Sequence, residues 1–216
     1  MSFFTSLLDL LFPPKCVFCS RVLNKSDEGI CDRCTESLSY AENHGKQNGE
    51  YFDFCIAPLY YTDVVRRSIL RYKFRDSSYY APIYAKLLAD CISECPEFSY
   101  DIISWVPLSE KREISRGYDQ AKLLASEAAS LLDDKIIATL SKPHDIKAQS
   151  ELGDRHERSK NISGAYKVTD PQLIINKRIL LIDDIITTGS TLDECAKVLI
   201  EAGAASVVCA VLARGR

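Results

Sequence analysis

The chain has no long hydrophobic run and no strong excess of charge of either sign. Its longest uninterrupted apolar stretch, residues 207–213, has seven residues, whereas a helix that spans a bilayer needs about 20. Lys and Arg number 27 against 30 Asp and Glu, a net charge of −3. No overall positive field therefore draws the chain to nucleic acid, although a local basic patch is compatible with this balance. We expect no membrane span.

The N-terminus lacks the features of a secretory signal peptide. Phe and Leu dominate residues 1–12, but no basic segment precedes them and Asp9 interrupts the run. No small-residue cleavage site follows. The spacing favours a short amphipathic helix that docks on the body of the protein. We therefore expect a cytoplasmic protein, in which thiols stay reduced.

Length and composition are those of a folded protein with a small extra module. The 216 residues are 46% hydrophobic and 26% charged, which excludes a disordered or fibrous chain. At about 150 residues per domain, the length allows one full domain and an appendage. Nine cysteines are present, and an odd number does not suit a complete disulfide framework.

Four of the cysteines form two closely spaced pairs near the N-terminus. Cys16 and Cys19 make one C-x2-C turn, and Cys31 and Cys34 make a second turn 11 residues later. Two such turns facing each other present four thiolates, the ligand set of closed structural zinc sites. An Fe–S cluster and reactive thiol pairs are the alternatives. The remaining cysteines lie in apolar segments and are expected to be small buried side chains: Cys55, Cys91, Cys95, Cys195 and Cys209.

Beyond the cysteines, strand-like and helix-like segments alternate. The polar stretch 36–50 indicates a loop and a boundary, so we expect a module over 1–50 and a domain over 51–216. Periodicity predicts strands at 54–60, 101–106, 136–140, 179–182 and 206–213, and helices at 64–74, 81–92, 118–132 and 191–202. Residues 141–163 are polar and too long for an ordinary connection. The alternation predicts a mostly parallel sheet with helices on its faces.

Residues 179–191 combine an apolar strand, two carboxylates and a hydroxyl-rich turn. The strand delivers Asp183 and Asp184 to its C-terminal end, where ligands of open α/β sheets bind. The hydroxyls and the free N–H groups at the next helix start suit a phosphate monoester, and the carboxylates suit sugar hydroxyls. The pattern points to a ribose 5-phosphate group. The plainer alternative is a strand–loop–helix in which Ser190 or Thr191 only caps the helix.

These 13 residues closely resemble the phosphoribosyl pyrophosphate (PRPP) signature of type I phosphoribosyltransferases. The resemblance implies that Asp183 and Asp184 meet the ribose hydroxyls. It assigns the 5-phosphate to the turn formed by Thr187, Thr188, Gly189, Ser190 and Thr191.

Other motifs narrow the resemblance to the ComF/GntX-like proteins. Residues 105–108 (Trp-Val-Pro-Leu), 111–112 (Lys-Arg) and 116–121 (Arg-Gly-Tyr-Asp-Gln-Ala) are similar to that family's strand, pyrophosphate loop and following helix. So are the cysteine module, residues 71–74 (Arg-Tyr-Lys-Phe), Gln149, and the pattern from Arg158 through Asn161 to Tyr166. Nearly all of residues 12–213 is covered. The family usually has Phe-Asn where this chain has Tyr118-Asp119, and the spacing from Gln149 to Asn161 is about one residue longer.

The resemblance implies a type I phosphoribosyltransferase-like α/β fold, with a mostly parallel sheet flanked by helices, preceded by a small zinc-binding module. It places further ligand contacts at Pro107, Leu108, Arg112, Arg116 and Lys73, and makes Arg158 a catalytic candidate beside the two aspartates. Arginines suit a pyrophosphate, although solvated surface arginines are the alternative. Mg²⁺ is implied on the pyrophosphate and ribose oxygens. The 141–163 loop corresponds to one that closes over PRPP.

A second interpretation comes from a basic, aromatic stretch. Nine of the 20 aromatic residues lie between positions 51 and 80, together with Arg66, Arg67, Arg71, Lys73 and Arg75. Cations and stacking rings are the ingredients of single-stranded nucleic-acid binding, but buried rings and solvated cations explain the same pattern. The resembled family is tied to DNA uptake. We therefore expect a phosphoribosyltransferase-like protein of that process, and keep as alternatives a non-enzymatic module for single-stranded DNA or for DNA-uptake or helicase-type partners, and a PRPP or nucleotide sensor.

Overall fold

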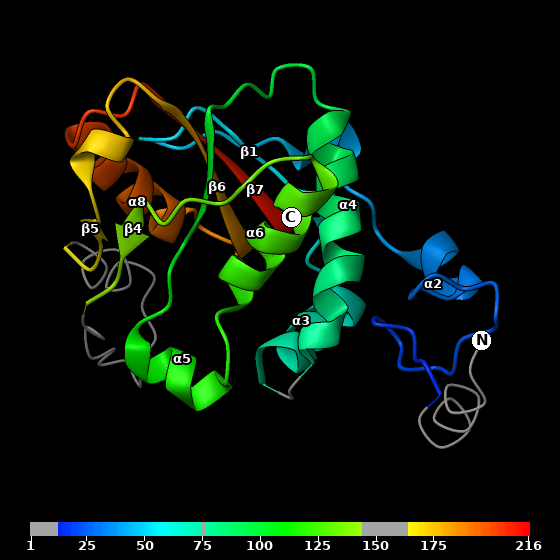
Figure 1. The fold of residues 1–216 in the computed structure, drawn as a ribbon. Coiled ribbons are helices and arrows are strands. Elements are labelled where there is room, and N and C mark those ends of the chain that lie inside the picture. Colours follow the sequence, from blue (N-terminus) through cyan, green and yellow to red (C-terminus); the bar gives the residue numbers. More distant parts are fainter. Residues whose placement is uncertain (1–12, 75–76, 144–163) are drawn as a thin grey trace.

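A parallel sheet lies at the centre of the computed structural model, which describes residues 13–74, 77–143 and 164–216. The strand order is β1-β7-β6-β3, with β2 pairing β7 further along its length (Figure 1). All of these pairings are parallel. The strands are β1 (Cys55–Ile56), β2 (Leu59–Tyr60), β3 (Ile102–Trp105), β6 (Arg178–Ile186) and β7 (Ser206–Arg214).

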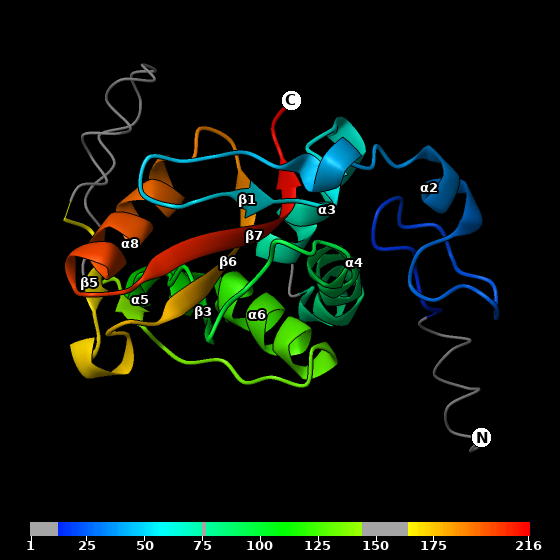
Figure 2. The same cartoon turned by 90° about the horizontal axis from the view of Figure 1, so that it is seen from above.

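Helices cover both faces of this sheet (Figure 2). One face carries α3 (Asp63–Phe74), α4 (Ala81–Ser93) and α6 (Gln120–Leu131), and the other carries α8 (Ser190–Glu201). Successive strand residues point to opposite faces, so Leu180 and Ile182 join the core beneath α3, α4 and α6, whereas Ile179 and Leu181 join the core beneath α8. The predicted parallel sheet with flanking helices is therefore confirmed.

The shorter elements lie around this frame. An antiparallel pair is formed by β4 (Leu140–Ser141) and β5 (Lys167–Val168). The remaining helices are α2 (Asp32–Ser37), α5 (Glu110–Arg116) and the 3-10 turns η1 (Glu42–Gly45), η2 (Ser78–Tyr80) and η3 (Pro171–Leu173).

Three predicted elements differ from the structure. The strand expected at 54–60 is divided into β1 and β2 around Pro58, which has no N–H to donate. In the strand expected at 136–140, Ile136 makes only a single bridge to Ile103, and Leu140 belongs to β4. The strand expected at 179–182 extends to Ile186, because β7 pairs with that end as well. The predicted N-terminal helix and most of the 141–163 loop lie outside the described residues.

The helix α5 was not predicted. It follows β3 directly, none of its residues is buried, and it ends at Gly117, which adopts a left-handed conformation with φ of 83°. A helix with no buried face has no apolar period, so hydrophobic periodicity cannot find it.

The N-terminal cysteine module is packed into the same core as α3 and α4. Phe18, between the first two cysteines, is 2% exposed and lies 5.9 Å from the ring of Tyr84 on α4, measured between ring centroids. Further along, Gln47 pairs with Cys55 and Tyr40 with Leu59 in antiparallel bridges. The module therefore packs its side chains against α4. Its backbone is also bridged to the strands β1 and β2, which follow residue 50. A domain boundary at that residue stays a prediction.

We expect the module and the body to unfold as one cooperative unit. Phe18→Ala removes a buried ring from the shared core and should lower the free energy of unfolding by about 3–5 kcal/mol. Val22→Ala, in the same module but at a side chain that is 50% exposed, should change it by less than about 1 kcal/mol. Urea unfolding followed by circular dichroism measures both. A separate early transition for the module, with the body unaffected, would contradict the shared core.

Candidate functional site

A polar pocket of about 270 Å³ lies at the carboxyl ends of β3 and β6. Neighbouring parallel strands end at the same edge of the sheet, so the segments that follow them converge there. The lining residues are Lys73, Val106, Pro107, Leu108, Arg112, Arg116, Gln120, Ala121, Lys142, Tyr166, Asp183, Asp184, Ile185, Thr187 and Thr191.

Asp184 is held by a cation from a helix far away in sequence. Its carboxylate is 7% exposed and points to the face covered by α3, where Lys73 Nζ lies 2.7 Å from Oδ2 and 2.9 Å from Oδ1. A buried carboxylate needs such a partner, because desolvation without one is costly. The structure thus brings together two predicted site residues that are 111 positions apart.

Asp183 is bound by the backbone of its neighbour. It points to the opposite face of β6, where its Oδ1 accepts the N–H of Asp184 at 2.8 Å. Burial, and then the charge of Asp184, raise the pKa of Asp183 to about 8, although Lys73 opposes the shift. Asp183 is therefore largely protonated at neutral pH, and it can donate a hydrogen bond as well as accept one.

The hydroxyl-rich turn joins β6 to α8. Gly189 has φ of 84°, a left-handed conformation that favours glycine, and its carbonyl accepts the first N–H of the helix, from Asp193, at 2.8 Å. Thr188 and Ser190 hydroxyls lie 2.9 Å apart. Thr187 and Thr191 line the pocket. The turn therefore presents hydroxyls and the amino end of α8 to whatever occupies the pocket.

Asp193 is the acidic side chain in the first turn of α8. Its Oδ1 accepts the backbone N–H groups of Glu50, at 2.8 Å, and Tyr51, at 3.0 Å. These two N–H groups partly offset the repulsion that the carboxylate would exert on an anion at the amino end of the helix.

The loop after β3 is fixed by Asp119, whose role the sequence left open. Asp119 Oδ1 accepts the N–H of Lys122 at 3.0 Å, which caps α6. Its Oδ2 accepts the N–H of Leu108, also at 3.0 Å. One carboxylate therefore sets both the start of α6 and the position of Pro107 and Leu108 at the wall of the pocket.

Arginines also line the pocket. Arg116 donates to Gln120 Oε1 at 2.7 Å and lies 4.8 Å from the ring centroid of Phe74. Arg112 is exposed on α5 and also lines the pocket. With Lys73 and Lys142, four cations and two carboxylates thus line one hollow, an arrangement suited to a ligand that carries both phosphate and hydroxyl groups.

Six lining residues were not predicted as ligand contacts, and three of them are polar: Lys142, Tyr166 and Gln120. Lys142 donates to the hydroxyl of Tyr166 at 3.1 Å and lies 4.7 Å from its ring centroid. Tyr166 and Gln120 stand within the motifs quoted for the family resemblance, so that resemblance could have found them. Lys142 offered no signal beyond its charge in a polar stretch.

Most predicted ligand contacts converge on the pocket. Asp183, Asp184, Thr187, Thr191, Pro107, Leu108, Arg112, Arg116 and Lys73 all line it. Thr188, Gly189 and Ser190 form the adjoining turn and are not among its lining residues. Arg158 lies outside the described residues, as do Gln149 and Asn161.

Comparison with known sequences agrees with this architecture. A profile of the phosphoribosyl transferase domain matches residues 119–216, and one of the double zinc ribbon domain matches residues 7–53. Competence protein F of Haemophilus influenzae is 25% identical over 93% of this chain and 96% of its own length. Competence protein ComFC of Streptococcus pneumoniae is 32% identical over 68% of this chain and 62% of its own length. The chain belongs to the ComF-like family of proteins with a phosphoribosyltransferase fold and an N-terminal zinc module.

Other relatives match a smaller part of the chain. The DNA utilization protein YhgH of Escherichia coli K12 is 29% identical over 50% of this chain. The matched region spans 46% of that protein. Within the parts of the chain that the structure describes, no helix is long and apolar enough to cross a membrane.

The four cysteines of the zinc ribbon meet as the family match requires. The Sγ atoms of Cys16, Cys19, Cys31 and Cys34 all lie within 4.8 Å of one another, and those of Cys19 and Cys31 are 3.6 Å apart. A tetrahedral ion with Zn–S bonds of about 2.3 Å separates its sulfurs by about 3.8 Å. The donor set therefore fits a closed structural zinc site. The other five cysteines are buried, as expected.

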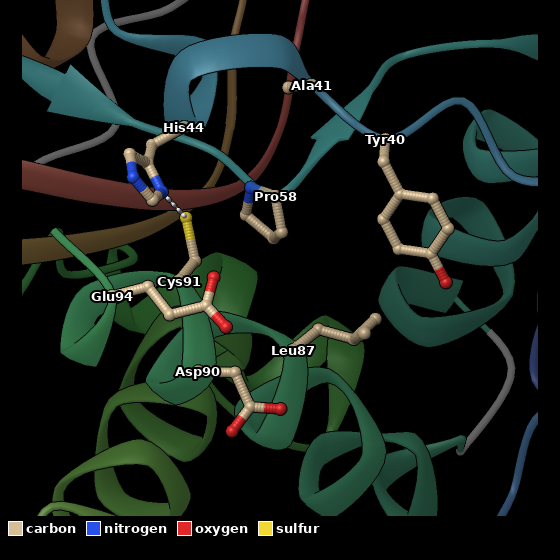
Figure 3. A pocket seen from close by; sticks show the side chains of 8 residues that line it. All are labelled: Tyr40, Ala41, His44, Pro58, Leu87, Asp90, Cys91 and Glu94. Atoms are coloured by element: carbon tan, nitrogen blue, oxygen red, sulfur yellow. Dashed lines mark hydrogen bonds between the residues drawn. The ribbon is translucent and has the colours of Figure 1, made fainter.

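A second hollow, of about 280 Å³, lies beside α4 (Figure 3). His44 Nδ1 and Cys91 Sγ are 3.9 Å apart there, and Asp90 and Glu94 lie on the α4 side. Its eight described lining residues carry two carboxylates and include no Lys or Arg. This charge does not suit a phosphate, so the pocket at the strand ends is the better candidate for a phosphorylated ligand.

The raised pKa of Asp183 predicts a pH-dependent stability. The folded state holds this proton up to about pH 8, whereas an unfolded aspartate loses it near pH 4. The stabilisation is therefore full below pH 4 and is lost as pH rises toward 8. Asp183→Asn keeps the shape without the charge, so its melting temperature should exceed that of the unmodified protein at pH 8, by roughly 2–10 °C. The gain should shrink at pH 5.

Asp184→Asn is the matched control for that measurement. It leaves the Lys73 ammonium without its carboxylate in a half-buried position, so we expect a lower melting temperature at both pH values. A fluorescence-monitored thermal unfolding series at pH 5, 6, 7 and 8 compares the three proteins. A stability difference for Asp183→Asn that does not change with pH would contradict the raised pKa.

Proposed function

We propose that this protein binds PRPP, or another ribose 5-phosphate ligand, and transfers its phosphoribosyl group to a nitrogen acceptor. The observation that carries the proposal is that two carboxylates, threonines of a hydroxyl-rich turn at a helix start and four cations line one pocket. Each part suits one part of such a ligand: the sugar hydroxyls, the 5-phosphate and the pyrophosphate.

The residues would divide the work as follows. Thr187 and Thr191, with the amino end of α8, would bind the 5-phosphate, and Asp183 and Asp184 the ribose hydroxyls. Arg112, Arg116 and Leu108 also line the pocket and would bind the pyrophosphate. The protein's contribution would be positioning and charge stabilisation rather than covalent chemistry.

The transfer itself is a substitution at C1 of the ribose. The acceptor nitrogen forms a bond to C1 with its lone pair while the bond from C1 to the pyrophosphate oxygen breaks, and that electron pair leaves with the pyrophosphate. The nitrogen then loses its proton to solvent. Charge on the leaving pyrophosphate would be stabilised by the two arginines.

Mg²⁺ would bind on the ligand's pyrophosphate and ribose oxygens. When bound, it neutralises part of the ligand's charge and retains much of its own water. The fit rests on the chemistry of the donors, because Asp183 and Asp184 supply hard oxygen atoms beside the ribose position. A nearby cation would also favour the ionised form of Asp183.

The cellular role is proposed from the relatives. Two are named competence proteins and a third is named a DNA utilization protein. We propose that this chain acts in DNA uptake or the handling of imported DNA, in the cytoplasm, with the phosphoribosyl pocket as its ligand-binding centre.

PRPP with Mg²⁺ should raise the melting temperature of the protein, and release of pyrophosphate should follow when a suitable nitrogen acceptor is present. Asp183→Asn/Asp184→Asn should abolish both effects, because it removes the groups that hold the ribose. Glu201→Gln, at an exposed carboxylate at the far end of α8, is the matched control and should leave both unchanged.

Two other outcomes separate the alternatives. A thermal shift with PRPP and no pyrophosphate release for any base in a broad panel would favour a sensor over a transferase. No shift with PRPP, ribose 5-phosphate or any nucleotide would contradict a phosphoribosyl site altogether.

A second candidate function is single-stranded DNA binding on the outer face of α3. Arg66 and Arg67 are exposed there, and Phe74 and Tyr79 are each 61% exposed. Fewer residues of the basic stretch are candidates for DNA contacts than the sequence suggested, because Arg71 and Lys73 bind other parts of the protein. Arg67 and Phe74 line one hollow, and an exposed ring beside an exposed arginine supports base stacking combined with backbone neutralisation.

Arg66→Ala/Arg67→Ala should weaken binding of a labelled oligothymidine by about tenfold at low salt and reduce the salt dependence of the affinity. Lys177→Ala, on the amino-end side of the sheet, is the control. Fluorescence anisotropy at several salt concentrations measures both. Equal affinities for the double variant and the control would remove this face from consideration.

A further inference from the structure

The first zinc knuckle is bound directly by the helix that reaches into the pocket. Val17 and Phe18 lie between the metal-binding cysteines Cys16 and Cys19, and the NH2 group of Arg71 on α3 donates to both of their carbonyl oxygens at 2.8 Å. Ser68, one turn earlier on α3, also donates to the Val17 carbonyl. These carbonyls are in place only while the knuckle keeps its shape.

The other side of the same helical turn belongs to the pocket. Lys73, two residues after Arg71, binds Asp184. Between them, the Tyr72 hydroxyl donates to the Gln120 carbonyl at 2.9 Å, and Tyr118 donates to the Tyr72 carbonyl. A single turn of α3 is therefore bound to the knuckle on one side and to the pocket wall on the other.

A continuous row of aromatic rings follows the same route. Phe18 lies 5.9 Å from Tyr84, Tyr84 lies 5.3 Å from Tyr72, and Tyr72 lies 5.7 Å from Tyr118, measured between ring centroids. Phe18, Tyr84 and Tyr72 are buried. Close-packed interiors transmit displacement, because no free volume absorbs it. A shift of the knuckle would therefore move the turn that carries Lys73.

From these contacts we propose that Arg71 is a positioning residue that couples the zinc knuckle to the phosphoribosyl pocket. Metal in the module holds the two carbonyls, the carbonyls hold Arg71, and Arg71 holds the turn of α3 from which Lys73 reaches Asp184. The proposal rests on the proposed function for the identity of the ligand, and it assigns the zinc module a role in setting the affinity of the pocket.

Loss of the metal leaves this turn without its support. A knuckle without its ion has no fixed conformation, and the Arg71 guanidinium, which also donates to the Tyr80 hydroxyl at 3.1 Å, then loses two of its acceptors. Coupling between sites is reciprocal. Ligand in the pocket must therefore tighten zinc binding by the same factor by which zinc tightens the ligand.

The test compares the unmodified protein with Arg71→Met, which cuts the link and leaves both the cysteines and Lys73 in place. Zinc content is measured by mass spectrometry and the affinity for PRPP with Mg²⁺ by calorimetry. We expect Arg71→Met to retain zinc and to bind PRPP about tenfold more weakly, a typical coupling between two sites. Removal of zinc by a chelator should weaken PRPP binding by the unmodified protein about as much as the substitution does. In Arg71→Met, zinc removal should cause little further loss of PRPP affinity.

Three further variants separate positioning from a general loss of stability. Arg71→Lys, which can still donate to the carbonyls, should recover part of the affinity. Asp63→Asn, at an exposed side chain in the first turn of α3, should bind PRPP normally. Val207→Ala, in the core at the amino end of β7, should lower the melting temperature without changing the response of PRPP affinity to zinc.

The coupling would be overturned if PRPP affinity were the same with and without zinc. It would also be overturned if the effects of zinc removal and of Arg71→Met were additive. Neither result would contradict the proposed function. If the unmodified protein binds no PRPP, the proposed function fails, and hydrogen exchange decides the coupling. The coupling is supported if zinc removal speeds amide exchange in residues 70–74 and 183–186, and if Arg71→Met shows the same faster exchange with zinc bound. Unchanged exchange there overturns it.

Discussion

The structure depends on one buried ion pair, between Lys73 and Asp184. It joins the end of α3 to the carboxyl end of β6, and so fixes where the helical layer meets the edge of the sheet at which ligands bind. Lys73 offsets the cost of burying the Asp184 carboxylate, while burial and the charge of Asp184 raise the pKa of its neighbour, Asp183. Two adjacent residues of the same type thereby lie in different electrostatic environments.

Around this pair, the sheet separates two cores that serve different purposes. The core beneath α8 lies next to the hydroxyl-rich turn that joins β6 to this helix. The other core contains α3, α4 and α6, and it also contains the first zinc knuckle. The small N-terminal module is thus part of the hydrophobic core that supports Lys73. A short chain gains from this arrangement, because a metal replaces apolar area that a module of this size cannot bury by itself.

Much of the fold could be predicted from the sequence. The helices α3, α4, α6 and α8 have apolar periods, and most of the strand β7 is one continuous apolar run. The motif at residues 179–191 placed two carboxylates at a strand end. The exposed helix α5 carries no period, and the break at Pro58 depends on pairing with β7. The contacts of Arg71 and Asp119 could not be read from the sequence, because each joins segments whose proximity only the tertiary structure creates. In the sequence, an arginine on an amphipathic helix gives the same pattern whether its side chain is solvated or donates to two carbonyl oxygens.

The opposite orientations of Asp183 and Asp184 have a consequence for how this chain can vary. Since side chains alternate along β6, inserting or deleting one residue between Ile179 and Asp183 would exchange the environments of the two carboxylates and turn the apolar residues before them to the wrong cores. Such a change would turn each shifted side chain to the opposite face of the sheet, so its effect would extend beyond the site of insertion. We therefore expect relatives to differ in length at the loops around the sheet, while the number of residues between the start of this strand and its paired acids stays constant.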